Sequence, residues 1–246
     1  PFVAAGVLEG AERVFGLHTA YDLEAGTVGL KPGINNAAVD HFRIRVHGKS
    51  THVSTPHLGV DALYIASQIV VAVQGLVTRC TSPTEPVIIG VGKLNAGTTY
   101  NAVAAFAEME GTTRTISQES RDRVRAQVSE TAQSIAALYG GTAEVEWTDF
   151  AAALVNDPQV CEEAARVVDE LLGAGHVVTD RELSLSGDNF AEFELYKPGA
   201  YAYLGTGNPD LPHTMITNHN GGFDVDENAL VTGAGLYVGY TVARLG

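Results

Sequence analysis

The sequence predicts an α/β protein in which a ferredoxin-like domain is inserted into a discontinuous outer domain. Between residues 39 and 151, strand and helix periodicities follow the order β-α-β-β-α-β, which forms a complete domain by itself. The flanking segments, 1–38 and 152–246, hold short apolar strands between turns rich in Gly, Asn and Pro, and are expected to be two pieces of one other domain. A chain of 246 residues is long enough for both domains.

The elements of the central segment follow from the spacing of its apolar residues. Phe42, Ile44 and Val46 alternate with charged or polar residues, which is the period of a half-buried strand. After Pro56, apolar residues recur every three or four positions, which predicts a helix. The predicted elements are a strand at 40–47, a helix at 58–78, strands at 87–92 and 102–115, a helix at 120–138 and a strand at 143–148.

The flanking segments give fewer elements. An apolar run at 14–18 predicts a strand. Residues 158–172 have helical spacing and begin with proline, which is favoured at the first position of a helix. Asp226 and Glu227 predict the N-cap and first-turn acids of another helix that begins at Asn228.

Composition and charge exclude several classes of protein. Apolar residues make up 45% of the sequence and charged residues 18%, as in a globular protein rather than a disordered one. The 15 lysines and arginines against 29 acidic residues give a net charge of −14, which repels nucleic acids and anionic lipids. Polar residues interrupt each apolar stretch before the roughly 20 residues that a membrane span requires. We therefore expect no nucleic-acid partner and no membrane span.

The cysteines and the N-terminus bear on location and processing. Cys80 and Cys161 form neither a CxxC motif nor a dense pattern, so we expect a reducing compartment and a cytoplasmic protein. The N-terminus, Pro1-Phe2-Val3, has no initiator Met and no basic segment before its apolar run. We expect it to be a cut end rather than a signal peptide.

The eight histidines are the most informative polar residues, because an imidazole can bind a metal or transfer protons near neutral pH. His18 ends an apolar strand, where its side chain either projects into a cleft or hydrogen-bonds to the backbone. His52 lies in a glycine-led turn, which is either a functional loop or a solvated one in which Ser54 or Thr55 caps the next helix. His219 lies close to an acidic run that helix capping also explains.

Seven short motifs along the chain carry a resemblance to a known family. They are Phe15-Gly16-Leu17-His18; Gly48-Lys49-Ser50-Thr51-His52 with Pro56-His57, Gly59 and Asp61; Gly97-Thr98 with Asn101; Gly111-Thr112-Thr113-Arg114; Pro198-Gly199-Ala200; Leu204-Gly205; and His219 with Phe223-Asp224, Asp226 and Glu227. In this order they resemble the C-terminal two-thirds of the di-zinc aminoacylase/carboxypeptidase family. The resemblance is to its N-acyl amino acid amidohydrolase branch, which includes hippurate and auxin-conjugate hydrolases.

The resemblance implies a catalytic domain that holds two divalent metal ions, zinc or manganese, and a ferredoxin-like insert that forms a homodimer. His18 and His219 correspond to metal ligands of the family. His52 corresponds to the insert histidine that reaches the partner subunit's site and stabilises the developing oxyanion. Asn101 and Arg114 match positions near the substrate, where an amide and a guanidinium can hold a carboxylate or carbonyl.

The resemblance also implies which parts lie outside this chain. The general-base glutamate and the remaining ligands (a cysteine or carboxylate, a histidine and a glutamate) are expected in a segment before Pro1, so Glu9 and Glu12 are not assigned that role. Asp188 and Asn189 stand where the branch often has two adjacent acids, which leaves the role of Asp188 open.

Two functional hypotheses follow. In the first, the parent protein is a metal-dependent amidohydrolase acting on small N-acyl amino acids or similar conjugates, and this portion of it is inactive alone. In the second, the chain is a non-catalytic dimerisation or binding module, because two ligands cannot hold a metal as the usual four do.

Overall fold

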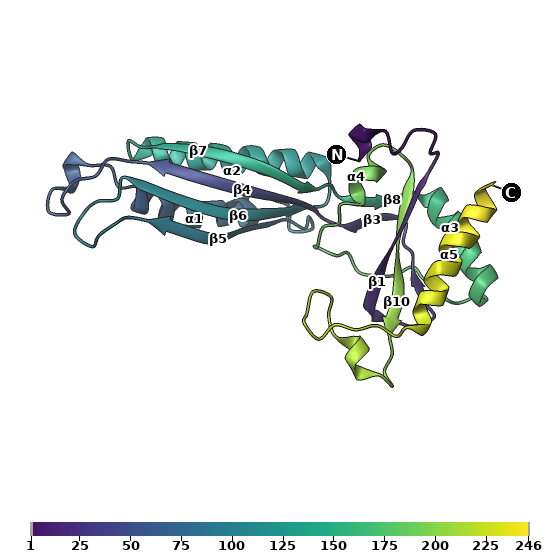
Figure 1. The fold of residues 1–246 in the computed structure, drawn as a ribbon. Coiled ribbons are helices and arrows are strands. Elements are labelled where there is room, and N and C mark those ends of the chain that lie inside the picture. The colour runs from purple at the N-terminus through teal and green to yellow at the C-terminus, as the bar shows by residue number, and fades with distance from the viewer. Residues whose placement is uncertain (1, 246) are drawn as a thin grey trace. The chain divides into compact units, whose positions relative to one another are not determined.

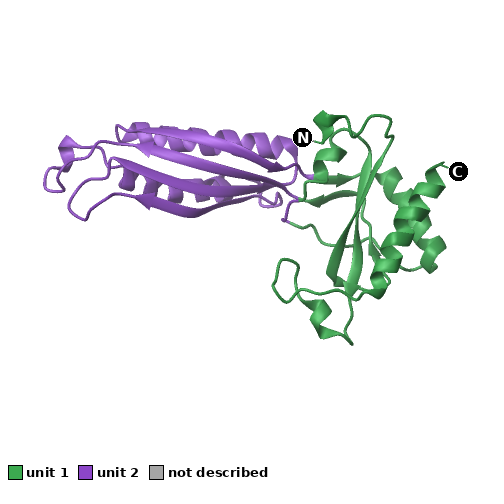
Figure 2. Cartoon of the chain, in the orientation of Figure 1, with its two compact units in different colours: residues 1–36, 154–184, 188–246 green, residues 37–153, 185–187 purple. Residues whose placement is uncertain are grey.

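The computed structural model describes residues 2–245 and divides into two compact units, shown in different colours in Figure 2. Unit 1 consists of residues 1–36, 154–184 and 188–246, and unit 2 of residues 37–153 and 185–187. Unit 2 therefore interrupts unit 1 along the sequence. Pro1, where the sequence predicts a cut end, lies outside the described residues.

Unit 2 is an antiparallel sheet with two helices on one face (Figure 1). In chain order its elements are β4 (Ala38–His47), α1 (Ala62–Arg79), β5 (Ile88–Ala96), β6 (Phe106–Thr115), α2 (Gln118–Leu138) and β7 (Thr142–Ala151). The strands lie in the order β5-β6-β4-β7, and neighbouring strands are antiparallel. The element order is the β-α-β-β-α-β order that periodicity predicts.

The core of unit 2 lies between the sheet and its helices. Phe42, Ile44 and Val46 of β4 are fully buried against α1 and α2, as their alternation predicts. The ring of Phe42 passes directly over Gly111 of β6, where a Cβ atom would come within 2.2 Å of the ring. A glycine at this position is therefore required by close packing rather than by backbone conformation.

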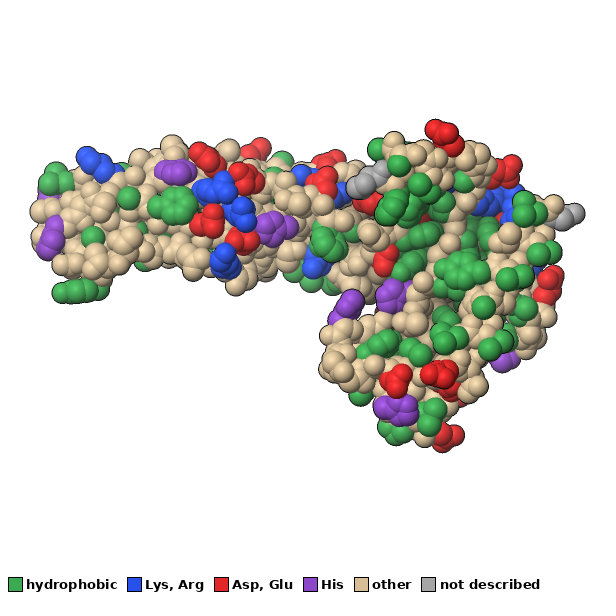
Figure 3. Space-filling model, in the orientation of Figure 1, with side chains coloured by type: hydrophobic (Ala, Val, Ile, Leu, Met, Phe, Trp, Pro, Cys, Tyr) green, Lys and Arg blue, Asp and Glu red, His purple; other side chains and the backbone are tan. Residues whose placement is uncertain are grey.

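The other face of this sheet carries rows of opposite charges, which gather in the middle of the face in Figure 3. Arg45 of β4 donates to Glu108 of β6 at 3.1 Å and to Glu146 of β7 at 2.7 Å. Glu110 accepts a hydrogen bond from Lys93 of β5 at 2.7 Å, and this bond is the main reason why its pKa is lowered to about 2. The uncovered face is thus polar, as expected for a sheet packed on one side.

Among residues 2–245, unit 1 contains a four-stranded sheet, a two-stranded sheet and three α-helices. Its elements are β1 (Val14–Glu24), β2 (Val28–Gly29), β3 (Gly33–Asn36), β8 (Leu154–Asn156), α3 (Pro158–Leu172), β9 (Val177–Val178), α4 (Ala191–Glu194), β10 (Gly199–Gly207) and α5 (Asn228–Leu245). The larger sheet has the order β1-β10-β2-β9, with β1 and β10 parallel, and β3 pairs with β8. Helices α3 and α5 contribute to its apolar core.

Two predicted elements begin four residues later in the structure than the sequence predicts. The strand predicted at 102–115 begins at Phe106, because the preceding residues form a loop in which Ala102 makes an isolated bridge to His52. The helix predicted at 58–78 begins at Ala62, and its N-cap is Asp61 rather than Ser54 or Thr55. A separate short 3-10 helix at Pro56–Leu58 precedes it, where the first turn of the helix is predicted.

Helix α1 is, within residues 2–245, the helix long and apolar enough to cross a membrane by length and composition. Its inner face belongs to the core of unit 2, where it buries Ala62, Ile65, Ala66, Ile69 and Val73. Its outer face exposes Leu63, Tyr64 and Val71, and the helix has no charged residue before Arg79. The outer face of α2, in contrast, carries acidic side chains and partly exposed arginines.

Candidate functional site

His18 lies on β1, opposite Tyr203 of β10. Its Nδ1 atom is 2.7 Å from the carbonyl oxygen of Thr19. A carbonyl oxygen can only accept a hydrogen bond, so the ring proton is assigned to Nδ1, and Nε2 keeps its lone pair. Metal-binding histidines usually donate their second ring N–H to such an acceptor. The hydrogen bond to Thr19 therefore leaves Nε2 of His18 available to a metal ion.

Asn218 joins the backbone beside His18 to the turn that contains His219. Its Nδ2 atom lies 3.3 Å from the oxygen of Thr19 and 3.4 Å from Nδ1 of His18, 200 residues away in sequence. Its Oδ1 atom is buried and has no hydrogen-bond partner among the described residues. His219 has a φ of 63°, a left-handed conformation that non-glycine residues rarely adopt. The two histidines predicted as metal ligands thus lie in one region of unit 1.

The rings beside His18 come from β10. Tyr201 and Tyr203 have ring centroids 6.1 and 6.0 Å from that of His18. Tyr201 donates its hydroxyl to Oδ2 of Asp188 at 2.7 Å, and burial together with this carboxylate raises the pKa of the tyrosine. Oδ1 of Asp188 accepts from the backbone N–H of Phe190 at 2.8 Å. Both oxygens of Asp188 are therefore already bonded within unit 1.

The donor set fits part of a metal site. Two imidazoles suit zinc, and the amide oxygen of Asn218, in the same turn as His219, is a further polar atom without a hydrogen-bond partner among the described residues. Residues 2–245 nevertheless contain no group of three or more His, Cys, Asp or Glu side chains placed to hold a metal ion. Catalytic zinc sites use three protein ligands and a water, so a complete site here requires ligands beyond those residues.

His52 lies in a loop of unit 2 that is closed at its base. The backbones of Lys49 and Val60 exchange two hydrogen bonds of 2.8 Å. Gly48 permits this closure, since a Cβ atom there would come within 2.2 Å of the oxygen of Val60. At the ring, the backbone N–H of Ser54 donates to Nδ1 of His52 at 3.2 Å. The proton of His52 is therefore assigned to Nε2, which faces outward as a donor.

Asn101 lies beside His52. The backbone N–H of Val53 donates to the oxygen of Asn101 at 3.1 Å, and His52 forms an isolated bridge with Ala102. The side chain of Asn101 is exposed, and its Oδ1 atom accepts from the hydroxyl of Thr99 at 3.2 Å. Two of the predicted substrate-side residues are thus joined by backbone contacts within one unit.

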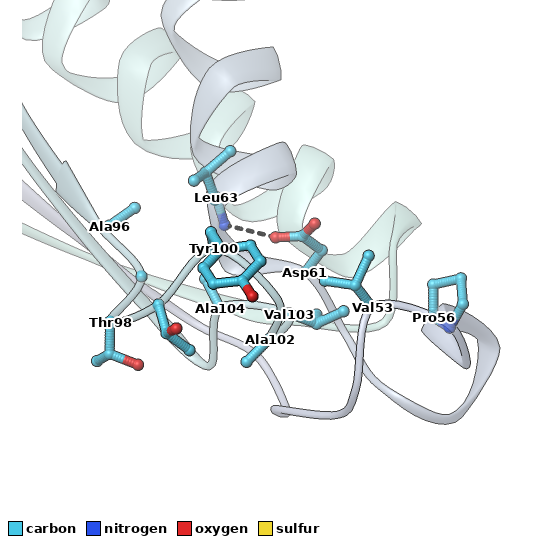
Figure 4. A pocket seen from close by; sticks show the side chains of 12 residues that line it. Val53, Pro56, Asp61, Leu63, Ala96, Thr98, Tyr100, Ala102, Val103 and Ala104 are labelled. Carbon is cyan, nitrogen blue, oxygen red and sulfur yellow. Dashed lines mark hydrogen bonds between the residues drawn. The ribbon is translucent and has the colours of Figure 1, made fainter.

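A pocket of about 610 Å³ adjoins this pair of loops (Figure 4). Val53 and Tyr100, the sequence neighbours of His52 and Asn101, line it together with apolar side chains and threonines. Its one charged lining residue among those described is Asp61, whose Oδ1 atom accepts from the backbone of α1 and caps that helix. The lining therefore suits a neutral group rather than a carboxylate.

Arg114 lies at the other end of unit 2. It is near the end of β6, whereas His52 follows the turn beside Phe106 at the beginning of that strand. At about 3.3 Å per residue, the two ends are roughly 25 Å apart. Burial lowers the pKa of Arg114, and the charge of Asp40 opposes this shift. Within one chain, Arg114 is not brought together with His52 and Asn101.

Sequence reasoning missed two residues of these sites. Asn218 contacts His18 across 200 positions, and no local pattern indicates such a contact. Ser54 is only two positions from His52, which is the spacing of a turn closed by a side chain and a backbone N–H. The contact between Ser54 and the ring of His52 could therefore have been predicted from the sequence.

Comparison with known proteins matches the chain to proteins named as deacetylases and peptidases. Residues 37–139 match the peptidase dimerisation domain of M20 type. N-acetyl-L-cysteine deacetylase of Bacillus subtilis is 36% identical over 226 residues, which are 92% of this chain and 52% of that protein. Thermostable carboxypeptidase 1 of Saccharolobus solfataricus is 33% identical over 235 residues, which are 95% of this chain and 58% of that protein.

A solved structure gives the same result. The Bacillus subtilis YXEP protein, described as a dinuclear metal binding peptidase from the M20 family, matches with a TM-score of 0.81 at 30% identity, over 99% of this chain and 60% of that one. The chain thus spans little more than half the length of these relatives. These matches confirm the resemblance carried by the motifs: the chain belongs to the M20 family of peptidases and deacetylases, with its dimerisation domain at residues 37–139.

Proposed function

We propose that the protein to which this chain belongs is a metal-dependent hydrolase that cleaves the amide bond of N-acyl amino acids or similar small conjugates. The observation that carries the proposal is the shared carbonyl oxygen of Thr19, which accepts from Nδ1 of His18 and from the side chain of Asn218 in the turn of His219, and so leaves Nε2 of His18 free. Relatives named as deacetylases and as a dinuclear metal binding peptidase support it.

In this proposal His18 and His219 contribute to holding two divalent metal ions, zinc or manganese. A bound metal supplies a water of lowered pKa and polarises the scissile carbonyl. His52 donates its Nε2–H to the oxyanion. Asn101 and Arg114 hold a carboxylate or carbonyl of the substrate. The general base and the remaining ligands come from the part of the relatives' length that this chain does not span.

We also propose that unit 2 is a ferredoxin-like dimerisation insert. Its sheet order, β5-β6-β4-β7, is that of a split βαβ domain. The apolar outer face of α1 is suited to burial against a second copy, whereas the charged outer face of α2 is not. Because Arg114 and His52 are roughly 25 Å apart in one chain, a single small-substrate site can use both only if they come from two subunits.

The test uses the complete protein, loaded with zinc or manganese and assayed on N-acetyl amino acids. His18→Ala and His219→Ala should lower metal content, measured by mass spectrometry, before any change in folding. His52→Ala should keep the metal and lower kcat by about 10²–10³-fold, the usual cost of losing one oxyanion donor. Unchanged metal content in both metal-site variants would contradict the assignment of those ligands.

The 246-residue chain alone should hydrolyse none of these substrates, because residues 2–245 lack a third ligand. Turnover by the chain that a chelator suppresses would show that its own residues complete the site. If the complete, metal-loaded protein hydrolyses no amide, the alternative of a non-catalytic binding module is the better one.

A further inference from the structure

We propose that Ser54 is a positioning residue for His52: it keeps the imidazole in the Nε2–H tautomer and fixes the direction in which Nε2 points. The inference rests on the proposed function, in which His52 donates to an oxyanion. Helix capping does not explain Ser54, because the cap of α1 is Asp61.

Both polar groups of Ser54 meet the same ring atom. Its backbone N–H lies 3.2 Å and its hydroxyl 2.7 Å from Nδ1 of His52. A backbone N–H only donates, so Nδ1 is the acceptor and carries no proton. The hydroxyl, which can donate or accept, then donates to the same nitrogen. A proton on Nδ1 would point at the backbone N–H of Ser54 and break that bond, whereas the hydroxyl would have to turn and accept.

The backbone on either side of the ring is already fixed. The N–H of Thr55 donates to the oxygen of His52 at 2.9 Å, and that of Val53 donates to the oxygen of Asn101 at 3.1 Å. Rotation of the imidazole about its own bonds is the freedom that remains, and the contacts of Ser54 remove it. Because His52 and Ser54 are both exposed, water can replace a lost hydroxyl in part, so the expected effect of its removal is moderate.

The tautomer can be measured directly in this chain, without metal or substrate. In a sample labelled with ¹⁵N-histidine at a pH of about 8, where imidazoles are neutral, Nε2 of His52 should carry the proton. The Nδ1 resonance should be shifted by the two hydrogen bonds, and Ser54→Ala should reduce that shift while Ser54→Thr retains it. Thr55→Ala is the matched control, since its hydroxyl bonds to the carbonyl of His52 and not to the ring.

The kinetic test uses the complete protein. Ser54→Ala should lower kcat about 3–10-fold, the effect of one neutral hydrogen bond, with KM changed less than twofold. Ser54→Thr should restore kcat and Thr55→Ala should leave it unchanged. In a His52→Ala background, Ser54→Ala should have no further effect, because it acts through the ring.

The possible results distinguish the positioning role of Ser54 from the proposed function of the protein. A proton on Nδ1 in the unmodified chain, or an Nδ1 resonance that Ser54→Ala leaves unchanged, would overturn the positioning role whatever the activity. The positioning role would also be overturned if Ser54→Ala lowered kcat as much in the His52→Ala background as in the original protein. An inactive complete protein with the expected resonances would contradict the proposed function and leave the Ser54 contact supported.

Discussion

Glu194, the last residue of α4, should make the stability of unit 1 depend on pH. Its Oε2 atom accepts from the backbone N–H of Val155 at 2.9 Å, while Oε1 is buried without a hydrogen-bond partner among the described residues. Burial, helped by the charge of Asp188, raises the pKa of Glu194 from 4.5 to about 7, although the bond from Val155 opposes this shift. The folded protein therefore holds a proton that the unfolded chain releases.

The size of the effect follows from that shift. Each pKa unit corresponds to about 1.4 kcal/mol, so a rise from 4.5 to about 7 amounts to about 3 kcal/mol. Because the folded pKa is the higher one, this stabilisation is complete below pH 4.5, decreases as the pH rises towards about 7, and is absent above it. Glutamine does not titrate, so Glu194→Gln should remove this dependence.

The assay is urea unfolding of the chain at several values between pH 4.5 and 8, for the original sequence and for Glu194→Gln. The difference between their free energies of unfolding should change by about 3 kcal/mol over this range. Glu170→Gln, at an exposed position of α3, is the control and should give a constant difference. A constant difference for Glu194→Gln as well would refute the reasoning from burial.

Three further predictions concern unit 2 and the proposed dimer. Arg121→Met should cost unit 2 about 3–5 kcal/mol, because the carboxylate of Asp40, 1% exposed, loses its bond of 2.6 Å to Arg121 and keeps Arg125 only at 3.9 Å. Urea unfolding followed by the single tryptophan, which lies in unit 2, measures this, and a cost below about 1 kcal/mol would contradict it. Val71→Glu on the outer face of α1 should convert a dimer into monomers by light scattering at tens of micromolar, and an unchanged mass would place the interface elsewhere. Mixing inactive His52→Ala and His18→Ala forms of the complete protein should restore part of the activity, since one hybrid site then has both histidines. No recovery, despite demonstrated subunit exchange, would show that His52 does not act across the dimer.

The spacing of apolar residues was enough to predict those helices and strands that bury one face. The alternation around Phe42 and the helical spacing after Pro56 are consequences of one-sided packing, so they can be read locally. The start of β6 could not be read in this way. Ala102 has strand-like neighbours, but its backbone is bridged to His52, and a contact across 50 positions leaves no periodic signal.

The candidate sites divide in the same way. Residue type and motif order indicated His18 and His52, but the tautomer of each ring depends on its particular acceptor or donor. Those partners, Thr19 and Ser54, are near in sequence and could be suspected. Asn218, in contrast, is placed by the packing of distant segments, so its role is visible only in the structure.

The pairing of Val39 with Ala151 has a consequence for the order of folding. These residues belong to the first and last strands of unit 2, so its entry and exit lie about 5 Å apart once it has folded. While unit 2 is unfolded, unit 1 has to close a loop of about 110 residues, at an entropic cost of roughly 4 kcal/mol. Once unit 2 has folded, the entropic cost of closing this loop is no larger than that of a short turn. Folding of unit 2 thus favours folding of unit 1 by roughly this difference, whereas unit 2, continuous from β4 to β7, closes no such loop through unit 1.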